Sequence, residues 1–334
     1  MSRYAAAHVD PQGPGDSRPT ALQIIQDEGV TDKLVGKVIV ITGVSSGIGI
    51  ETVRALTTTG ATLYVTARDI AKATTALVDT WHPDRMELVE MDLGSFQSVR
   101  LAAEKILSKT KNVNILINNA GIMAIPELQL TEDGHELQFG TNHLSHFLFF
   151  QLLKPALLAA TTPQFQSRVV TLTSSGHRLQ GINASDNYNF EKGGYSPWVA
   201  YAQSKTANIY MATEIERRYG SQGLHATSVH PGAIRTGLSK YIPTAQLQAM
   251  RSNPATTNAV KNPEQGAATS VWAAIGKEWE GKGGKYLSNC SAAEKGADDG
   301  DLMSVEYVSH TYDVESAIRL WDDSIKLCHI SGSD

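Results

Sequence analysis

The sequence predicts an α/β fold in which one parallel, doubly wound sheet carries helices on both faces. Short hydrophobic runs rich in β-branched residues alternate with helical segments from residue 37 onward. These runs are apolar throughout, as strands buried on both faces of a sheet should be. The first run, 37–42, ends in a glycine-rich turn that leads directly into a helical segment. Together these observations predict a single domain built from right-handed strand–helix–strand crossovers.

The individual elements follow from this alternation. The expected strands are residues 37–42, 62–67, 86–92, 113–120, 168–175, 224–232 and 284–289. The expected helices are residues 21–30, 50–60, 98–109, 142–160, 201–220 and 313–328. Residues 21–334 then form the domain. Residues 1–20 contain several Pro, Gly and Asp residues, and we expect them to form a flexible lead-in.

Composition excludes several classes of protein. The chain has 334 residues, of which 41% are hydrophobic and 19% charged, as in ordinary globular domains. A net charge of −5 gives no reason to expect nucleic acid or an anionic membrane as a partner. No segment reaches the ~18 uninterrupted apolar residues of a membrane span, and the N-terminus lacks the apolar core of a signal peptide.

The metal-binding and redox residue types show no recognisable site pattern. The two cysteines, Cys290 and Cys328, are far apart and stand outside metal or redox spacings. A reducing, cytoplasmic setting is therefore expected. His143 and His146 are three positions apart, but no third ligand follows at a recognisable spacing, so no metal is expected.

The turn after the first strand has the sequence TGVSSGIG, residues 42–49. Gly43, Gly47 and Gly49 allow a sharp turn, a close approach of backbone to a phosphate, and tight packing of the next helix. The helix N-terminus then offers free N–H groups and the positive end of its dipole to a pyrophosphate. The turn lacks Gly-Lys-Ser/Thr, so it predicts a Rossmann-type dinucleotide site rather than a P-loop; the alternative is a purely structural turn.

The end of the second strand indicates which dinucleotide is preferred. A site for NAD(H) usually has an acidic residue at this strand tip, whereas this chain has Ala67 followed by Arg68. Arginine pairs with a ribose 2′-phosphate, so NADP(H) is expected over NAD(H). The alternative is a solvated Arg68 paired with Asp69.

Several short motifs occur in a fixed order along the chain: TGVSSGIG (42–49), NNAG (118–121), SS (174–175), YAQSK (201–205) and HPG (230–232). With these motifs, residues from about 33 to 289 resemble a short-chain dehydrogenase/reductase. The stretches NHLSHF, VVTLTSSGHR and VHPGAIRT are similar to its retinol-dehydrogenase-like and WW-domain-oxidoreductase-like branch. The chain has no apolar N-terminal anchor, which is typical of soluble, fungal-type members.

The resemblance implies four catalytic residues: Asn142, Ser175, Tyr201 and Lys205. Tyr201 and Lys205 are four positions apart and therefore share one helix face. We expect the lysine ammonium and an oxidised nicotinamide to lower the pKa of the tyrosine toward neutrality, so that it exchanges a proton with a carbonyl or alcohol oxygen. Ser175 would hydrogen-bond the same oxygen, and Asn142 would hold a water; the alternatives are a turn serine and a helix-capping asparagine.

The resemblance also implies a set of cofactor contacts, which are Gly43, Ser45, Ser46, Gly47, Ile48, Gly49, Arg68, Asp92, Leu93, Asn119, Ala120, Gly121, Tyr201, Lys205, Pro231, Gly232, Ile234 and Thr236. Substrate contacts are expected on two loops, 177–200 and 237–255, beyond the strand ends. Their candidate residues are His177, Tyr195, Trp198 and Tyr241. These aromatic residues favour an apolar ketone, aldehyde or alcohol of polyketide or terpenoid type, although they serve equally well as loop anchors.

The expected function is therefore an NADP(H)-dependent oxidoreductase of biosynthetic metabolism. One alternative is a non-redox isomerisation, dehydration or epimerisation on the same fold, because tyrosine acid–base chemistry also serves enolisation. A second alternative is a cofactor-sensing module without catalysis. A homodimer through residues 142–160 and 200–219 is also expected by resemblance, although the apolar face of the first helix is equally typical of a core helix.

Overall fold

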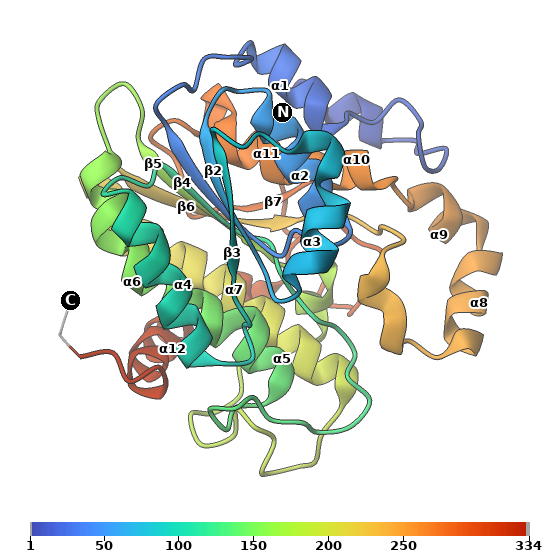
Figure 1. Ribbon diagram of the computed structural model, residues 1–334. Helices are drawn as coiled ribbons and strands as arrows, with labels where there is room; N and C mark the ends of the chain where they lie inside the picture. Colours follow the sequence, from blue (N-terminus) through green and yellow to red (C-terminus); the bar gives the residue numbers. More distant parts are fainter. Residues whose placement is uncertain (1, 332–334) are drawn as a thin grey trace.

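The sheet of the protein has the strand order β3-β2-β1-β4-β5-β6-β7-β8 in the computed structural model, which describes residues 2–331 (Figure 1). Its strands are β1 (Val38–Thr42), β2 (Thr62–Ala67), β3 (Met86–Glu90), β4 (Ile115–Asn118), β5 (Ser167–Leu172), β6 (Leu224–His230), β7 (Tyr286–Ser288) and β8 (Ser291–Ala292). Neighbouring strands are parallel except β7 and β8. The predicted fold class is confirmed, and the short antiparallel β8 is an addition that the sequence did not indicate.

The strand order places a ligand crevice at the centre of the sheet. β1 pairs with β2 on one side and with β4 on the other, so the chain changes its direction across the sheet between β1 and β4. In doubly wound sheets, ligands bind beyond the carboxyl ends of the strands at such a switch point. The glycine turn follows β1, and the NNAG segment follows β4.

Each central strand contributes to two separate cores. In β1, Val38 and Val40 belong to one hydrophobic cluster, whereas Ile39 and Ile41 belong to the other. Side chains alternate between the two faces of a strand, so an apolar run fills both cores at once.

Helices cover both faces of the sheet (Figure 1). One layer contains α4 (Phe96–Lys109), α5 (Leu137–Phe139), α6 (Ser145–Ala160), α7 (Pro197–Tyr219) and α12 (Val314–Leu327). The other contains α1 (Ala21–Glu28), α2 (Ile48–Thr57), α3 (Ile70–Ala76), α10 (Pro263–Gly266) and α11 (Ala268–Ile275). Outside both layers lie α8 (Thr244–Ser252) and α9 (Pro254–Ala259), neither of which has a buried residue.

Short helical turns complete the described chain. They are the 3-10 turns η1 (Ala5–His8), η2 (Val78–Thr80), η4 (Ser175–Leu179), η5 (Gly220–Gln222), η6 (Gly237–Tyr241), η7 (Lys277–Trp279) and η8 (Ser309–Tyr312), and the π-helical turn η3 (Gly140–Leu144). No helix within residues 2–331 combines the length and apolar character needed to cross a membrane.

The N-terminal segment differs from the flexible lead-in that we expected over residues 1–20. Met1 lies outside the described residues, but residues 2–20 pack on the domain. Tyr4 joins the core that contains α1, and Arg18 is 4% exposed. Composition could not reveal this packing, because the partners of Arg18 are more than 200 residues away in the chain, at residues 258–260.

The C-terminal helix α12 covers part of the surface that we expected at a dimer interface. The Trp321 ring packs edge-on against Phe147 and Phe150 of α6, with centroid distances of 4.9 and 6.2 Å. The Arg218 guanidinium of α7 lies 4.7 Å from the same ring. This part of the apolar face of α6 and α7 is therefore covered by the chain itself, and the homodimer stays a prediction.

Candidate active site

Tyr201 and Lys205 lie one helical turn apart near the start of α7. Pro197 occupies the first turn of this helix, where its missing N–H has no intrahelical acceptor to lose. Tyr201 and Lys205 are each only 4% exposed. Lys205 Nζ lies 5.5 Å from the centre of the Tyr201 ring and donates to the Leu172 carbonyl, at the end of β5, at 3.2 Å. The predicted pair therefore shares one helix face at the carboxyl edge of the sheet.

Burial favours the neutral forms of the Tyr201 phenol and the Lys205 amine. It raises the pKa of Tyr201 to about 12, and a hydrogen bond with the Ser174 side chain acts in the opposite direction. It lowers the pKa of Lys205 to about 8. In the protein on its own, desolvation therefore outweighs the hydrogen bond with Ser174; the expected fall of the Tyr201 pKa toward neutrality concerned a site that also holds an oxidised nicotinamide, and it stays a prediction. A neutral phenol is the form that donates a proton.

The two serines of the pair Ser174–Ser175 have different contacts. The Ser174 side chain hydrogen-bonds Tyr201 and also accepts from the Gly176 N–H at 3.0 Å. The Ser175 hydroxyl instead donates to the Leu302 carbonyl at 2.8 Å. We assigned the second serine of the pair from the motif alone. Ser175 is the serine that the resemblance implies, and its role stays a prediction; in this structure η4 begins at Ser175, whose side chain faces the C-terminal segment, and Ser174 is the serine that interacts with Tyr201.

Asn142 lies in the π-helical turn η3 and joins two parts of the site. Its side-chain oxygen accepts from the Ile122 N–H at 2.9 Å, and its Nδ2 donates to the Ile122 carbonyl and to Ser204 Oγ, both at 2.9 Å. A Cβ on Gly121 would lie 3.3 Å from Asn142 Oδ1 and 3.4 Å from Lys205 Nζ. Asn142 therefore ties the segment after β4 to α7 beside the catalytic lysine, and its water-holding role stays a prediction.

The glycine turn packs directly against the segment after β4. Gly43 has φ +76°, and a Cβ there would lie 2.6 Å from the Ala120 Cβ. A Cβ on Gly49 would clash with the Gly43 carbonyl and lie 2.7 Å from Asn119 Nδ2. Asn119 fixes the turn by donating to the carbonyls of Thr42 and Gly43 at 2.8 and 3.0 Å. These approaches require glycine at both positions.

Two observations indicate that this turn accommodates a polar ligand. Gly47 precedes α2, so no side chain caps the N–H groups at the start of that helix. Asn118 is 1% exposed, and neither of its side-chain amide atoms has a hydrogen-bond partner among the described residues. Buried polar atoms are normally paired, so an unpaired amide at the end of β4 and an uncapped helix N-terminus after β1 both fit a bound dinucleotide. Ser45, Ser46 and Ile48 belong to the same turn and first helical residue.

Arg68 follows β2 at the predicted position. Its side chain is 75% exposed, and its NH1 lies 4.0 Å from Asp92 Oδ2. Asp69 instead caps α3 by accepting from the Lys72 N–H at 2.9 Å. Arg68 therefore lies next to Asp92 in the structure and is not paired with Asp69, as the alternative had it. Leu93, next to Asp92, is buried in the core near α4.

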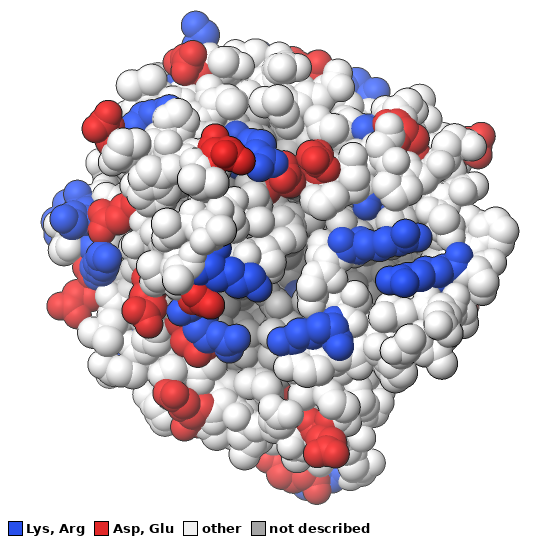
Figure 2. Space-filling model, turned by 45° about the vertical axis from the view of Figure 1, so that its right-hand side comes forward, with Lys and Arg blue, Asp and Glu red and all other residues white. Residues whose placement is uncertain are grey.

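The segment after β6 completes this side of the site. Thr236 contacts the glycine turn, because a Cβ on Gly47 would lie 3.3 Å from Thr236 Cγ2. Ile234 forms a parallel bridge with Lys261, and the turn at Pro231–Gly232 lies between β6 and this bridge. Residues 231–262 contain no Asp or Glu, and their Lys and Arg residues are Arg235, Lys240, Arg251 and Lys261. Figure 2 shows Lys and Arg side chains gathered around a hollow of the surface, which suits an anionic ligand.

The four expected substrate residues have different surroundings. His177 is fully buried, and its ring contacts the Ser174 carbonyl at 2.8 Å and Thr311 Oγ1 at 3.1 Å, so it does not face a substrate. Tyr195 donates to the Ile125 carbonyl at 2.9 Å and anchors its loop. The Trp198 ring lies edge-on to the Tyr201 ring at 6.2 Å, and Tyr241 is 39% exposed on η6. Of these four residues, Trp198 is the one whose ring pairs with that of Tyr201.

A C-terminal segment that we had assigned no chemistry reaches the site. The buried Arg178 donates to the carbonyls of Ala297 and Glu306, both at 2.8 Å. This holds residues 297–306 above η4, where Ser175 binds the Leu302 carbonyl. Leu302 and Met303 are 38% and 41% exposed. No local signal reveals this loop, because its anchors are more than 100 residues away in the chain.

The two neighbouring histidines on η3 and α6 have protein partners. His146 Nε2 contacts Thr42 Oγ1 at 2.9 Å, and His143 Nε2 contacts Ser324 Oγ at 3.0 Å. Burial lowers the pKa of His146 to about 4 and that of His143 to about 3. Within residues 2–331, no group of three or more His, Cys, Asp or Glu is arranged to hold a metal ion.

Comparison with known proteins identifies relatives of the whole chain. Residues 37–247 match the family model for short chain dehydrogenases. The chain is 46% identical to the short-chain dehydrogenase/reductase prx1 of Penicillium roqueforti over 98% of this chain and 96% of that protein. It is 34% identical to the human WW domain-containing oxidoreductase over 82% of this chain and 66% of that protein. A crystal structure of an uncharacterized protein from Mycobacterium Paratuberculosis superposes with a TM-score of 0.66 at 32% identity, covering 88% of this chain and 94% of that one.

Proposed function

This chain belongs to the short-chain dehydrogenase/reductase family, in the branch that we expected, and we propose that it is an NADP(H)-dependent oxidoreductase that interconverts a carbonyl compound and an alcohol. The observation that carries this proposal is the buried Tyr201 side chain, which is hydrogen-bonded to Ser174 and lies one helical turn from the Lys205 ammonium. These groups lie at the same edge of the sheet as the glycine turn and Asn118.

In the proposed reaction, the residues of the protein transfer a proton to or from one oxygen, that of the carbonyl or alcohol group. NADPH, when bound, supplies the hydride to the carbonyl carbon, and NADP⁺ accepts it in the reverse direction. Tyr201, held neutral by burial, donates its proton to the carbonyl oxygen as negative charge develops there. The Ser174 hydroxyl is a preset donor to the same oxygen. The Lys205 ammonium stabilises the phenolate that Tyr201 becomes.

The residues that would hold the cofactor follow the crevice between β1 and β4. The glycine turn and the N-terminus of α2 would bind the pyrophosphate, and Asn118 would bind a polar group through its unpaired amide. Arg68 supports the preference for NADP(H), because its exposed guanidinium offers bidentate bonds to a 2′-phosphate. Lys205 would hold the ribose next to the nicotinamide.

The substrate is proposed to be an apolar ketone or aldehyde, of the size and polarity of a polyketide or terpenoid intermediate. Three segments support this choice: Trp198 precedes the catalytic tyrosine, Tyr241 lies exposed on η6, and Leu302 and Met303 lie exposed beside Ser175. Apolar walls with few polar groups suit such a ligand. Cys290 and Cys328 are free and buried, which supports a reducing, cytoplasmic setting.

The test is a panel of apolar ketones and aldehydes incubated with NADPH, with reduced nicotinamide followed by absorbance. Wild-type protein is expected to consume NADPH with at least one compound, and Tyr201→Phe is expected to bind NADPH without turning over. Turnover by Tyr201→Phe at the wild-type rate would contradict the assigned role of the phenol. Product formation without net consumption of cofactor would instead favour isomerisation, dehydration or epimerisation.

A further inference from the structure

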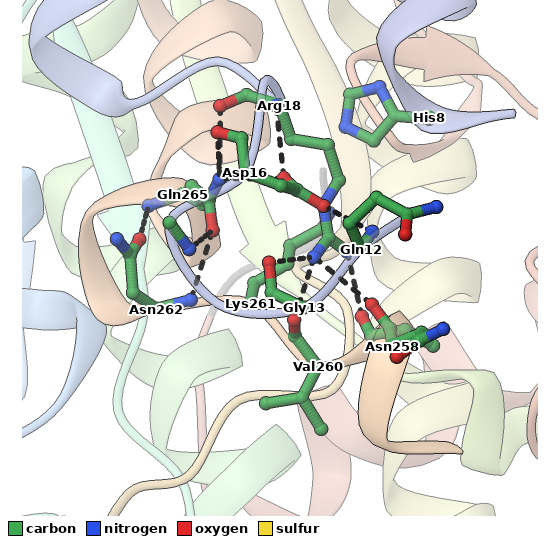
Figure 3. A network of polar contacts seen from close by, with 12 residues as sticks. His8, Gln12, Gly13, Asp16, Arg18, Asn258, Val260, Lys261, Asn262 and Gln265 are labelled. Atoms are coloured by element: carbon green, nitrogen blue, oxygen red, sulfur yellow. Dashed lines mark hydrogen bonds and ion pairs between the residues drawn. The ribbon is translucent and has the colours of Figure 1, made fainter. Parts of the chain in front are cut away.

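Arg18, in the segment before α1, holds the end of α9 (Figure 3). We call residues 12–18 the N-terminal strap. The Arg18 side chain is 3% exposed, and its guanidinium donates to the carbonyls of Asn258, Ala259 and Val260 at 3.3, 2.8 and 2.7 Å. The last carbonyls of a helix lack partners within the helix, and a cation there complements the helix dipole. Arg18 therefore caps α9 from outside.

Gln265 and Asp16 fix the strap itself. Gln265 is 1% exposed; its Oε1 accepts from the Gly15 N–H at 3.0 Å, and its Nε2 donates to the carbonyls of Asp16 and Arg18, both at 3.1 Å. The Asp16 carboxylate accepts from Arg18 Nε at 2.8 Å. Burial on its own would raise the pKa of Asp16, but hydrogen bonds from Arg18 and Gln12 lower it to about 2. The strap therefore contains the Arg18–Asp16 ion pair, and Gln265 anchors it to α10.

Lys261 follows directly after the carbonyls that Arg18 holds. Its Nζ donates to the Pro231 carbonyl at 3.2 Å and to Asn289 Oδ1 at 2.9 Å, and its backbone N–H donates to the Ala233 carbonyl at 2.8 Å. The residue is 3% exposed. One buried cation therefore joins the turn after β6 to the end of β7.

The backbone at this junction is strained. Asn289 and Cys290 have φ values of +51° and +50°, a region that few residues other than glycine adopt. Lys261 holds the Asn289 side chain, and Thr269 Oγ1 accepts from the Cys290 N–H at 3.1 Å. Strained conformations persist where surrounding contacts enforce them, and they cluster at functional sites.

We propose that the N-terminal strap and Lys261 are positioning elements for the Pro231–Gly232 turn, and that through this turn they set the affinity for the nicotinamide half of NADP(H). This inference rests on the proposed function. The path of contacts runs from Arg18 to the Val260 carbonyl, along the backbone to Lys261, and from its ammonium to Pro231. No step passes through Tyr201, Lys205 or the glycine turn.

The experiment compares two ligands in the full-length protein by calorimetry: NADPH, and adenosine 2′,5′-bisphosphate, which lacks the nicotinamide half. Arg18→Met and Lys261→Met are each expected to weaken NADPH binding about tenfold, the effect of losing one or two charge-assisted hydrogen bonds. Binding of the bisphosphate should change less than about twofold, since both variants leave the adenine side of the site intact. Arg3→Met is the control, because Arg3 lies outside the strap and contacts Glu28 and the Tyr4 ring rather than Lys261 or residues 258–260.

Each outcome bears on the proposal. Unchanged NADPH affinity in both variants, or an equal loss for both ligands, would overturn it, since the second result indicates a general loosening of the site. Should Arg18→Met fail to fold, Arg18→Lys replaces it; a lysine keeps the charge but cannot span three carbonyls, so an intermediate loss specific to NADPH is expected. A wild-type protein that binds neither ligand would refute the proposed function instead.

Discussion

Removal of the hydroxyl groups of Ser174 and Ser175 should have very different consequences. Ser174 hydrogen-bonds the buried Tyr201, and we propose it as a donor to the reacting oxygen, so Ser174→Ala should remove a preset donor to developing charge. Such donors contribute about 2.7–4 kcal/mol to the transition state, which corresponds to a loss of about 10²–10³ in kcat. Ser175 donates to the neutral Leu302 carbonyl at 2.8 Å, and a bond of this kind contributes about 1 kcal/mol to stability. Ser175→Ala should therefore keep kcat within about threefold of wild type.

The assay is steady-state NADPH oxidation with a carbonyl substrate from the panel, measured for both variants beside their urea-unfolding midpoints. Ser174→Ala should lose turnover without a matching loss of stability. Ser175→Ala should lose a little stability and raise KM, because the 297–306 loop loses an anchor. The reasoning would be refuted if Ser175→Ala lost as much kcat as Ser174→Ala, or if Ser174→Ala turned over normally.

Three further predictions concern the cofactor, the proton and the packing of the C-terminal helix. Arg68→Ala should weaken NADPH binding about ten- to a hundredfold in calorimetry and leave NADH binding unchanged. Replacement of the exposed Lys72 by alanine should change the binding of neither cofactor. Equal losses for both cofactors in Arg68→Ala would argue against a 2′-phosphate contact. Burial lowers the pKa of Lys205 to about 8, so the ammonium is lost as pH rises through this value and the rate of carbonyl reduction should fall above it. Lys205→Arg, which stays charged, should abolish that fall, and a pH profile identical to wild type would count against the role of the ammonium. Trp321→Ala should lower the free energy of unfolding by about 3–5 kcal/mol in urea titrations. Because it uncovers α6, it should also promote self-association in size-exclusion chromatography. Replacement of the partly exposed Trp81 by alanine should neither destabilise the protein to this extent nor promote self-association.

Local patterns predicted the fold because each local choice agrees with the global one. The strands are uniformly apolar since both of their faces are covered, as Val40 and Ile41 show by entering opposite cores. The glycine turn was recognisable because its positions meet the backbone of the segment after β4, where only glycine fits. Tyr201 and Lys205 were recognisable from the ordered motifs that resemble the family, and their spacing of one helical turn is consistent with a shared site.

Some surroundings of the candidate site depend on contacts that the sequence does not display. The pair Ser174–Ser175 gave no indication of which hydroxyl faces Tyr201, since that is decided by where the strand ends and η4 begins. His177 was expected at the substrate, but Thr311 and the Ser174 backbone bury it. Arg18 and Leu302 each bind residues more than 100 positions away in the chain, so composition and periodicity cannot reveal these contacts.

Deuterium transfer tests the central claim most directly. NADPH labelled with deuterium on its transferable C4 position would be incubated with wild-type protein and an accepted carbonyl substrate, and the alcohol analysed by mass spectrometry and NMR. The account predicts deuterium on the carbinol carbon with wild-type protein, and none with Tyr201→Phe although that variant still binds NADPH. An unlabelled product from wild-type protein, or a fully labelled one from Tyr201→Phe, would contradict it.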